Sequence, residues 1–292
     1  MIRVGTRGSA LALAQATWVG ERLGSPYELV TVATLGDRGV AVGDKSRWVS
    51  ALEQALLADE IDVAVHSAKD VPAEIADGLE LVAFTARADP RDAICGAGSL
   101  AALPAEARVG TSSLRRAAQI RAARDDVSVV ELRGNVDTRL RKLAEGECDA
   151  LVLAVAGLER LGRRDAADGV LVELVPAAGQ GALALEARVG RSVPVDAVAD
   201  EATTACVLAE RELTRALGAS CNTPVGALAR VLRGSGGGAG GLDGGGELEL
   251  LAWAGRADGS AWISDRLSGA ASGLGARVAE RMLSCGAAEL LS

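Results

Sequence analysis

The chain has 292 residues, 49% of them hydrophobic and 24% charged, which allows two or three domains with hydrophobic cores and excludes disorder for most of its length. Its formal net charge of −8 argues against nucleic acid or an acidic membrane as a partner. The sequence shows no signal peptide, no apolar run of membrane-spanning length and no CxxC metal pattern among its five cysteines. We therefore expect a cytoplasmic protein with free thiols and no metal site.

Taken in chain order, the hydrophobic pattern predicts strands that alternate with helices. Such alternation is typical of the α/β class, in which helices cover parallel sheets. The expected strands cover residues 2–5, 28–34, 61–65, 79–83, 108–110, 127–132 and 150–155. The expected helices cover residues 10–23, 48–58, 113–124, 137–144 and 203–217.

The chain also repeats itself. RVGTRGSALALAQ at 3–15 matches RVGTSSLRRAAQ at 108–119, and EIDVAV at 60–65 matches ECDALV at 147–152. Either match alone is compatible with chance similarity between ordinary βα units. Because both occur in the same order, we expect two similar α/β domains, of the type found in periplasmic binding proteins, around a cleft.

The pattern changes after the helix at 203–217. Strands at 248–253 and 261–267 flank the hairpin signal Arg-Ala-Asp-Gly, and a closing helix is expected at 277–291. We therefore expect three domains, namely an α/β domain of residues 1–95 to which about 182–199 return, an α/β domain of residues 98–180, and a small α+β domain of residues 203–292.

The stretch IDVAVHSAKDVP at 61–72 places Lys69 and Asp70 directly after a strand. Ligands of open α/β sheets bind outside the carboxyl ends of the parallel strands, so this cation and carboxylate lie at a candidate site. The alternative is an ordinary solvated junction between a strand and a loop.

Hydroxyl groups and arginines gather at two turns between a strand and a helix, and again after the strand at 127–132. Helix N-termini and guanidinium groups both bind carboxylates, so we expect a ligand that carries several of them. The serines and threonines could equally be simple helix N-caps. The residues concerned are Thr6, Arg7 and Ser9 at the first turn, Thr111, Ser112, Ser113, Arg115 and Arg116 at the second, and Arg133 and Arg139 after the third strand.

Cys221 lies in LGASCNTPVG, between the end of a helix and the start of a strand, so we expect it on a loop. The other four cysteines fit buried small hydrophobic residues. A Cys–His hydrolase is poorly supported, because His66 is the only histidine of the chain. Cys221 remains a candidate for covalent attachment.

The motifs together resemble the hydroxymethylbilane synthase family, also called the porphobilinogen deaminase family. The resemblance spans almost the whole chain in the order of the family. It rests on TRGSALALAQA, HSAKDVP, DPRDA, VGTSSLRR, LRGNVDTRL, LAVAGLERLG, PAAGQGA and the loop of Cys221.

This resemblance implies a monomeric, three-domain transferase of tetrapyrrole biosynthesis that condenses four porphobilinogen molecules head to tail and releases ammonia. It further implies a dipyrromethane cofactor, linked by a thioether to Cys221, on which the four rings are assembled before hydrolysis releases hydroxymethylbilane. Asp70 matches the catalytic aspartate of the family. The residues that match its cofactor-binding positions are Lys69, Ser113, Arg115, Arg116, Arg133 and Arg139, and those that match its substrate-binding positions are Arg7, Ser9, Arg133 and Arg139.

The chain departs from the family pattern at its mobile loop, which reads VGDKSRW here and looks shortened. Lys45 and Trp48 are the candidates for the lid of the family. The arginine that the family carries after LERLG has two candidates, Arg163 and Arg164. Two rival interpretations stay open: a non-catalytic anion-binding module of solute-binding type, and a cysteine-dependent transferase.

Overall fold

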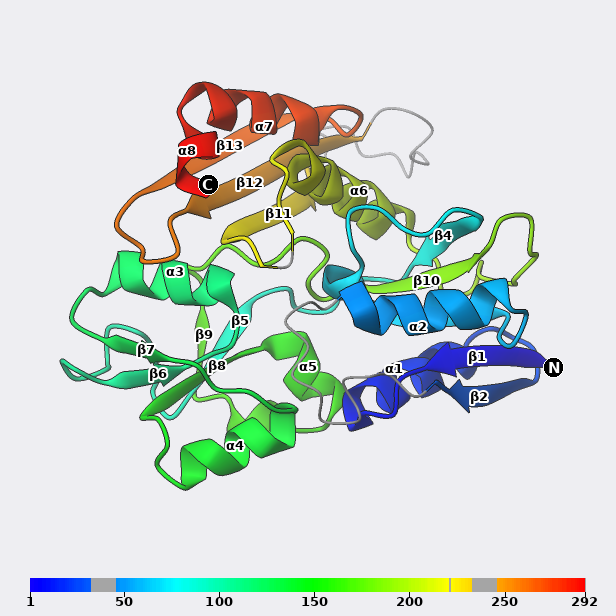
Figure 1. Ribbon diagram of the computed structural model, residues 1–292, viewed down its shortest axis with the longest axis horizontal. Coiled ribbons are helices and arrows are strands. Elements are labelled where there is room, and N and C mark those ends of the chain that lie inside the picture. Colours follow the sequence, from blue (N-terminus) through cyan, green and yellow to red (C-terminus); the bar gives the residue numbers. More distant parts are fainter. Residues whose placement is uncertain (33–45, 221, 233–245, 292) are drawn as a thin grey trace. The chain divides into compact units, whose positions relative to one another are not determined.

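The computed structural model describes residues 1–32, 46–220, 222–232 and 246–291 (Figure 1). Contacts divide the chain into two compact units. Unit 1 consists of residues Met1–Ala88 and Gly181–Ala205, and unit 2 of Asp89–Gln180 and Cys206–Ser292. No helix among the described residues is long and apolar enough to cross a membrane.

Unit 1 is built on a five-stranded sheet with the order β2-β1-β3-β10-β4. Helix α1 packs on one face through Ala16 and Val19, and helix α2 packs on the other through Leu52 and Leu56. The bounds are β1 Ile2–Thr6, α1 Ala10–Gly20, β2 Tyr27–Thr31, α2 Ser46–Leu57, β3 Val63–Ser67, β4 Leu79–Phe84 and β10 Leu183–Arg188.

Unit 2 contains a second five-stranded sheet with the corresponding order, β7-β6-β8-β5-β9. Ile120 of helix α3 contributes to the core on one face of this sheet, and Leu158 of helix α5 to the core on the other. The bounds are β5 Asp92–Cys95, β6 Arg108–Gly110, α3 Leu114–Ala123, β7 Ser128–Val130, α4 Val136–Ala144, β8 Ala150–Ala154, α5 Val155–Arg160 and β9 Gly169–Leu171.

The predicted fold class, two similar α/β domains of the periplasmic-binding-protein type, is confirmed, and the repeated sequences form β1–α1 and β6–α3. The expectation of wholly parallel sheets is wrong. Strand β10 runs antiparallel to β3 and β4, and β5 runs antiparallel to β8 and β9. Neither strand was predicted, because Leu-Ala-Leu-Glu-Ala-Arg has the composition of a helix and Asp-Ala-Ile-Cys is too short to show a period.

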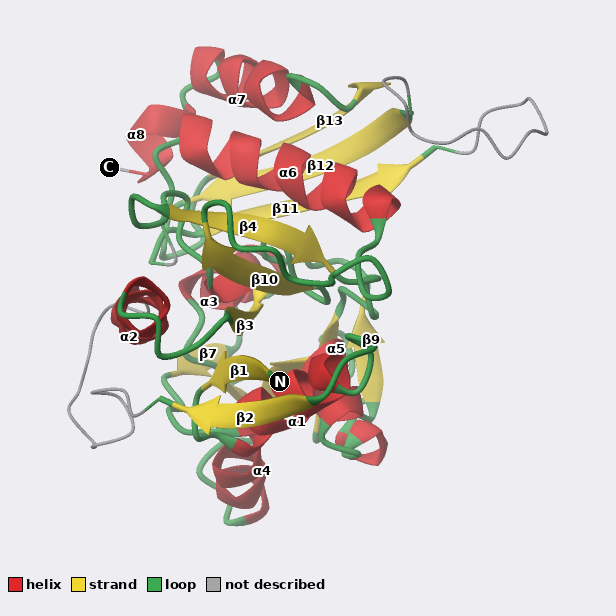
Figure 2. Ribbon diagram, turned by 90° about the vertical axis from the view of Figure 1, so that its right-hand side faces the viewer, coloured by secondary structure: helices red, strands yellow, loops and turns green. Residues whose placement is uncertain are grey.

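The C-terminal part of the chain forms the predicted small α+β domain. Its antiparallel sheet has the order β11-β12-β13, with α7 and α8 packed against it (Figure 2). The expected single closing helix is wrong, because Gly286 adopts a φ of 94° and separates α7 from α8. The bounds are α6 Glu201–Ala216, β11 Val225–Val231, β12 Glu247–Gly255, β13 Trp262–Ala270, α7 Leu274–Ser284 and α8 Ala287–Leu291.

Each copy of the repeat contains an equivalent ion pair. In each, an arginine of the first strand binds an aspartate that lies just before the third strand of that copy. In unit 1, Arg3 N donates to Asp62 Oδ2 at 2.8 Å and Arg3 Nη2 to Oδ1 at 2.7 Å. In unit 2, Arg108 N donates to Asp149 Oδ2 at 2.7 Å and Nη2 to Oδ1 at 3.0 Å. The Asp62 side chain is 8% exposed and that of Asp149 45%. We therefore expect the Asp62 pair to stabilise unit 1 more than the Asp149 pair stabilises unit 2.

Asp62→Asn should lower the free energy of unfolding by about 1–3 kcal/mol, because it removes charge-assisted hydrogen bonds from a buried group. The hydrogen bond from Arg3 lowers the pKa of Asp62 to about 2. The stabilisation is thus fully present above the ordinary aspartate pKa and is lost as the pH falls toward 2. Urea unfolding between pH 7 and pH 2 measures this loss. Asp149→Asn is the matched control, and an equal loss in both variants would contradict the argument.

Candidate active site

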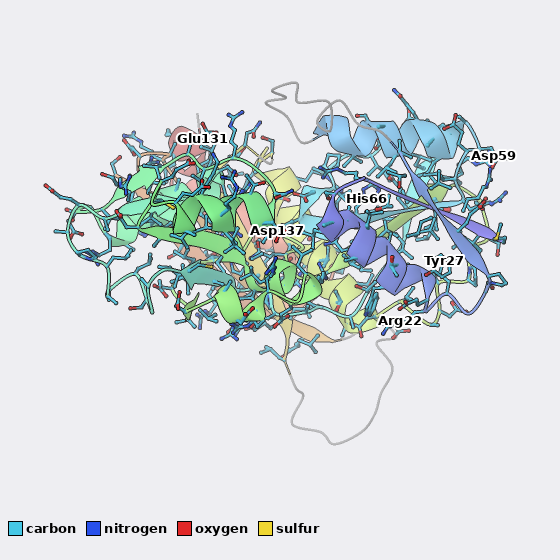
Figure 3. All side chains as sticks on the ribbon, turned by 90° about the horizontal axis from the view of Figure 1, so that it is seen from below. Arg22, Tyr27, Asp59, His66, Glu131 and Asp137 are labelled. Atoms are coloured by element: carbon cyan, nitrogen blue, oxygen red, sulfur yellow. The ribbon has the colours of Figure 1, made fainter. Side chains whose placement is uncertain are left out.

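A pocket in unit 1 lies at the carboxyl ends of β1 and β3, the position predicted for a ligand. The loop after β1, the first turns of α1 and the end of β3 form its wall. Figure 3 labels His66 among these elements. The structure thereby brings together the polar side chains of Arg7, Ser9, Gln15, His66, Ser67 and Asp70.

Asp70 is held at this pocket by a single 3-10 turn, Ala68–Asp70, that continues β3. Ala68 N donates to Ala182 O at 3.0 Å, which ties the turn to the segment before β10. The Ser67 hydroxyl exchanges hydrogen bonds with the Gln15 side-chain amide, at 2.9 and 3.1 Å. Lys69 and Asp70 are half-buried, so the turn presents a cation and a carboxylate side by side at the end of the strand.

Ser9 and Ser113 act as helix N-caps, the alternative that their sequence context left open. The Ser9 hydroxyl accepts from Ala12 N at 3.3 Å, and the Ser113 hydroxyl accepts from Arg116 N at 3.4 Å. Both caps hold a helix N-terminus, with its unpaired amides, at the carboxyl end of its sheet. A cap in this position leaves the positive end of the helix available to a carboxylate.

Arg115 and Arg116 have a partner inside the protein that the sequence did not predict. Arg116 Nη2 donates to Asp92 Oδ1 at 2.7 Å, and Arg115 Nη2 lies 2.8 Å from Asp92 Oδ2. Gln180 Nε2 donates to the same carboxylate at 2.8 Å. All three charged side chains are buried. Burial alone would raise the pKa of Asp92, but the charges of Arg115 and Arg116 hold it well below its ordinary value.

The Asp92 cluster leaves one donor unused. Arg115 Nε is buried and has no hydrogen-bond partner among the described residues. Because a buried donor without an acceptor is unfavourable, this atom fits an additional carboxylate oxygen. The contact of Arg115 and Arg116 with cofactor carboxylates stays a prediction. It requires guanidinium N–H groups that are not bonded to Asp92.

The remaining predicted arginines lie at the same sheet edge of unit 2. Strands β6, β7 and β8 are parallel, so their carboxyl ends are neighbours. Arg133 follows β7, and its side chain is 64% exposed and bonded through Nε to Glu131, which Figure 3 labels. Arg139 lies in helix α4, whose N-cap is Asn135. Both arginines follow the strand end at which the sequence predicts anion binding.

Some predicted residues cannot be compared with the structure. Lys45 and Cys221 lie outside the described residues, and Trp48 belongs to the first turn of α2. The two candidates for the missing family arginine each lie near a carboxylate. Arg163 Nη2 is 3.2 Å from Asp137 Oδ1. Arg164 Nε is 3.8 Å from Glu159 Oε1.

The sequence did not predict four residues of the site regions, namely Gln15, Asp92, Gln180 and Glu186. Gln15, Asp92 and Gln180 each lie inside a motif that carried the family resemblance, which was the available signal. Glu186 carried no signal, because its strand was not predicted.

Comparison with known proteins agrees with the motifs. A family model described as porphobilinogen deaminase, dipyromethane cofactor binding domain, matches residues 2–194, and a second, porphobilinogen deaminase C-terminal domain, matches residues 204–284. Porphobilinogen deaminase from Deinococcus radiodurans is 44% identical over 313 residues, which cover 99% of this chain and 97% of that protein. The chain belongs to the porphobilinogen deaminase family.

The chain is also similar to another relative and to solved structures. Porphobilinogen deaminase from Thermus thermophilus is 48% identical over 248 residues, 79% of this chain and 81% of that protein. The periplasmic VFT2 domain of Bordetella pertussis BvgS superposes with a TM-score of 0.39 at 16% identity, over 67% of this chain and 83% of that one. A TRAP periplasmic solute-binding protein from Desulfovibrio salexigens, with bound orotic acid, gives a TM-score of 0.35 at 13% identity, over 65% and 70% of the two chains.

Membership of the porphobilinogen deaminase family assigns the chain hydroxymethylbilane synthase activity, with porphobilinogen as substrate and a dipyrromethane cofactor. The chain is therefore a transferase of tetrapyrrole biosynthesis. The non-catalytic anion-binding module, which the sequence left open, is excluded by this assignment.

Asp92→Asn should destabilise unit 2 by about 3–5 kcal/mol, because it leaves two buried guanidinium groups without a counter-charge. Urea unfolding followed by circular dichroism measures the loss. Arg133→Ala is the matched control, with an exposed side chain and no expected change in stability. An Asp92→Asn protein as stable as the wild type would show that Arg115 and Arg116 do not depend on this carboxylate.

Proposed function

We propose that Asp70 is the catalytic acid of the synthase and that Cys221 carries the cofactor. Each condensation forms one carbon–carbon bond, breaks one carbon–nitrogen bond and releases ammonia. Asp70 protonates the leaving amine, and its carboxylate then stabilises the cation left on the substrate pyrrole. The same carboxylate takes up the proton that the attacking ring loses, which returns Asp70 to its acid form.

The observation that supports this role is the pocket that Asp70 shares with Arg7 and Ser9 within unit 1. Porphobilinogen carries an acetate and a propionate group as well as its aminomethyl group. Arg7, Lys69 and the N-terminus of α1 behind Ser9 provide positive charge for those carboxylates. A substrate bound in this way presents its amine toward Asp70.

The dipyrromethane supplies, when bound, the pyrrole end to which each new ring is joined. For its carboxylates we propose Lys69, the N-terminus of α3 behind Ser113, and a set of arginines in unit 2. The exposed Arg133 side chain and the unused Arg115 Nε support this proposal. The arginines concerned are Arg115, Arg116, Arg133 and Arg139. Arg133 and Arg139 also serve the substrate as the chain of rings lengthens.

We also propose the predicted domains, residues 1–95 with about 182–199, 98–180 and 203–292, and a monomeric, cytoplasmic enzyme. None of the four described cysteines forms a disulfide, which fits a reducing compartment. Burial raises the pKa of Cys95 to about 11, so this thiol is unreactive and does not compete with Cys221 for the cofactor. Lys45 and Trp48 are proposed as a lid over the site.

The intact mass of the denatured protein tests the covalent cofactor. We expect a mass above the 29.6 kDa of the bare chain by two linked pyrrole units. Cys221→Ser should remove the added mass and abolish turnover. Cys285→Ser is the matched control, because Cys285 is an exposed free thiol and its loss should leave mass excess and turnover intact. An added mass that survives Cys221→Ser, or no adduct after incubation with porphobilinogen, would contradict the proposal.

Asp70→Asn should fold, carry the cofactor and lose about 10²-fold or more in turnover, because Asn cannot donate the proton to the leaving amine. Porphobilinogen consumption and the intact mass are measured on the same sample. Asp77→Asn, in the loop between Asp70 and β4, is the control and should retain full turnover. Undiminished consumption by Asp70→Asn would refute the acid role.

A further inference from the structure

A buried hydrogen-bonded pair of His66 and Glu186 lies just before the Ala68–Asp70 turn of unit 1. His66 Nε2 and Glu186 Oε2 are 3.0 Å apart, and the two side chains are 5% and 0% exposed. His66 is the only histidine of the chain, and neither residue has a role in the chemistry proposed above. The pair therefore calls for a separate explanation.

The pair joins two neighbouring inner strands of the sheet diagonally. Strands β3 and β10 are antiparallel, with Ala184 opposite His66 and Glu186 opposite Ala64. His66 and Glu186 consequently project from the same face, the one that Ala64 shares with the core beneath α2. A hydrogen bond between them fixes the rotation and register of β3 at its last residues.

This arrangement is costly for the fold. Glu186 Oε1 is buried and has no hydrogen-bond partner among the described residues, so only one oxygen of the carboxylate is compensated there. Buried polar or ionic pairs are often no more stabilising than well-packed apolar residues of similar volume. Stability alone thus gives no reason for a histidine and a glutamate at these two positions.

The pair is placed where it can hold Asp70. His66 lines the same pocket as Asp70 and comes directly before Ser67, which α1 holds from the opposite face through Gln15. The turn after Ser67 carries Lys69 and Asp70. The end of β3 is therefore fixed on both faces of the sheet, by Gln15 on one side and by Glu186 on the other.

A third buried side chain extends this support to the segment after Asp70. Glu53 of α2 accepts from Ala76 N at 3.1 Å, in the loop between Asp70 and β4. Burial, and to a smaller extent the charge of Glu186, raises the pKa of Glu53, while His66 lowers it, so the three groups form one electrostatic cluster. The cluster contacts the chain on either side of the catalytic turn.

We propose that His66, held by Glu186, is a positioning residue for Asp70. The inference rests on the proposed role of Asp70 as the acid. The pair fixes the direction in which the turn leaves β3, and hence the distance between the Asp70 carboxyl and the leaving amine. A displacement of about 1 Å at such a site can reduce the rate about 10²-fold.

The decisive variant is the double substitution His66→Leu with Glu186→Leu, which removes both polar groups of the pair together. An apolar pair should leave the urea midpoint unchanged or higher. We expect kcat to fall about tenfold to a hundredfold while KM for porphobilinogen stays within about twofold, because the positive groups that hold the substrate are intact. A stable double variant with wild-type kcat overturns the proposal. So does a loss that lies entirely in KM.

Two further variants keep the outcome decisive. His66→Gln can still donate to Glu186 and should retain kcat within about threefold, whereas a loss as large as that of the double variant would overturn positioning by this hydrogen bond. If the double leucine variant does not fold, His66→Asn replaces it, because its side chain is too short to reach Glu186. The same fall in kcat is expected, and wild-type kcat overturns the proposal.

The control is Asp62→Asn, at the other end of the same strand, which should lose stability and keep kcat. Wild type and Asp70→Asn are measured in the same assay with cofactor loading checked by mass. A wild type that consumes no porphobilinogen would refute the enzymatic activity itself. A fully active Asp70→Asn would remove the acid role. Full kcat in the double variant, with Asp70→Asn inactive, overturns only the positioning by His66.

Discussion

Each of the two α/β sheets contains one antiparallel strand inserted next to the parallel ones, and each inserted strand carries a fully buried carboxylate. Glu186 on β10 pairs with His66, and Asp92 on β5 pairs with Arg115 and Arg116. A buried carboxylate must be compensated locally, so Glu186 and Asp92 fix where their partner side chains on neighbouring elements lie. These partner side chains belong to the segments that carry the proposed site residues, β3 with its turn and the first turn of α3. Within each unit, the inserted strand thus fixes the segment that carries the proposed site residues of that unit.

The same constraint divides the arginines of unit 2 into two groups. Arg115 and Arg116 direct most of their N–H groups to Asp92 and to backbone carbonyls of Val152 and Val175. Their main effect is therefore to hold α3 against the sheet. Arg133 is exposed and pairs weakly with Glu131 at the surface, so its charge is available to a ligand. A motif read from sequence gives these residues one common role, whereas burial separates them. Substitution of the first group is expected to lower stability as well as cofactor binding, and substitution of the second to weaken binding alone.

The sequence predicted the features that have a local cause. The repeat at 3–15 and 108–119 predicted two similar domains because a short strand, a capped turn and an Ala-rich helix each follow from their own residues. The placement of Arg7, Ser9 and Asp70 at one sheet edge followed from the rule for parallel strands. The inserted strands β5 and β10 arise from pairing between distant segments, and no local pattern marks them. Asp92 and Glu186 were missed for this reason, since a buried carboxylate in an unpredicted strand looks like any surface acid.

The two copies of the repeat share their frame and differ in the segment after the third strand. Both have the Arg–Asp pair at the start and a serine cap at the first helix. After β3, however, the chain makes a short polar turn with Lys69 and Asp70, whereas after β8 it enters the apolar helix α5 directly. A turn can present a carboxyl to a substrate and needs support to keep it in place, which His66 and Gln15 provide. A helix rigidifies itself and buries its side chains. With the roles proposed for Asp70 and for the arginines, the duplication yields one unit suited to proton transfer and another suited to holding anions.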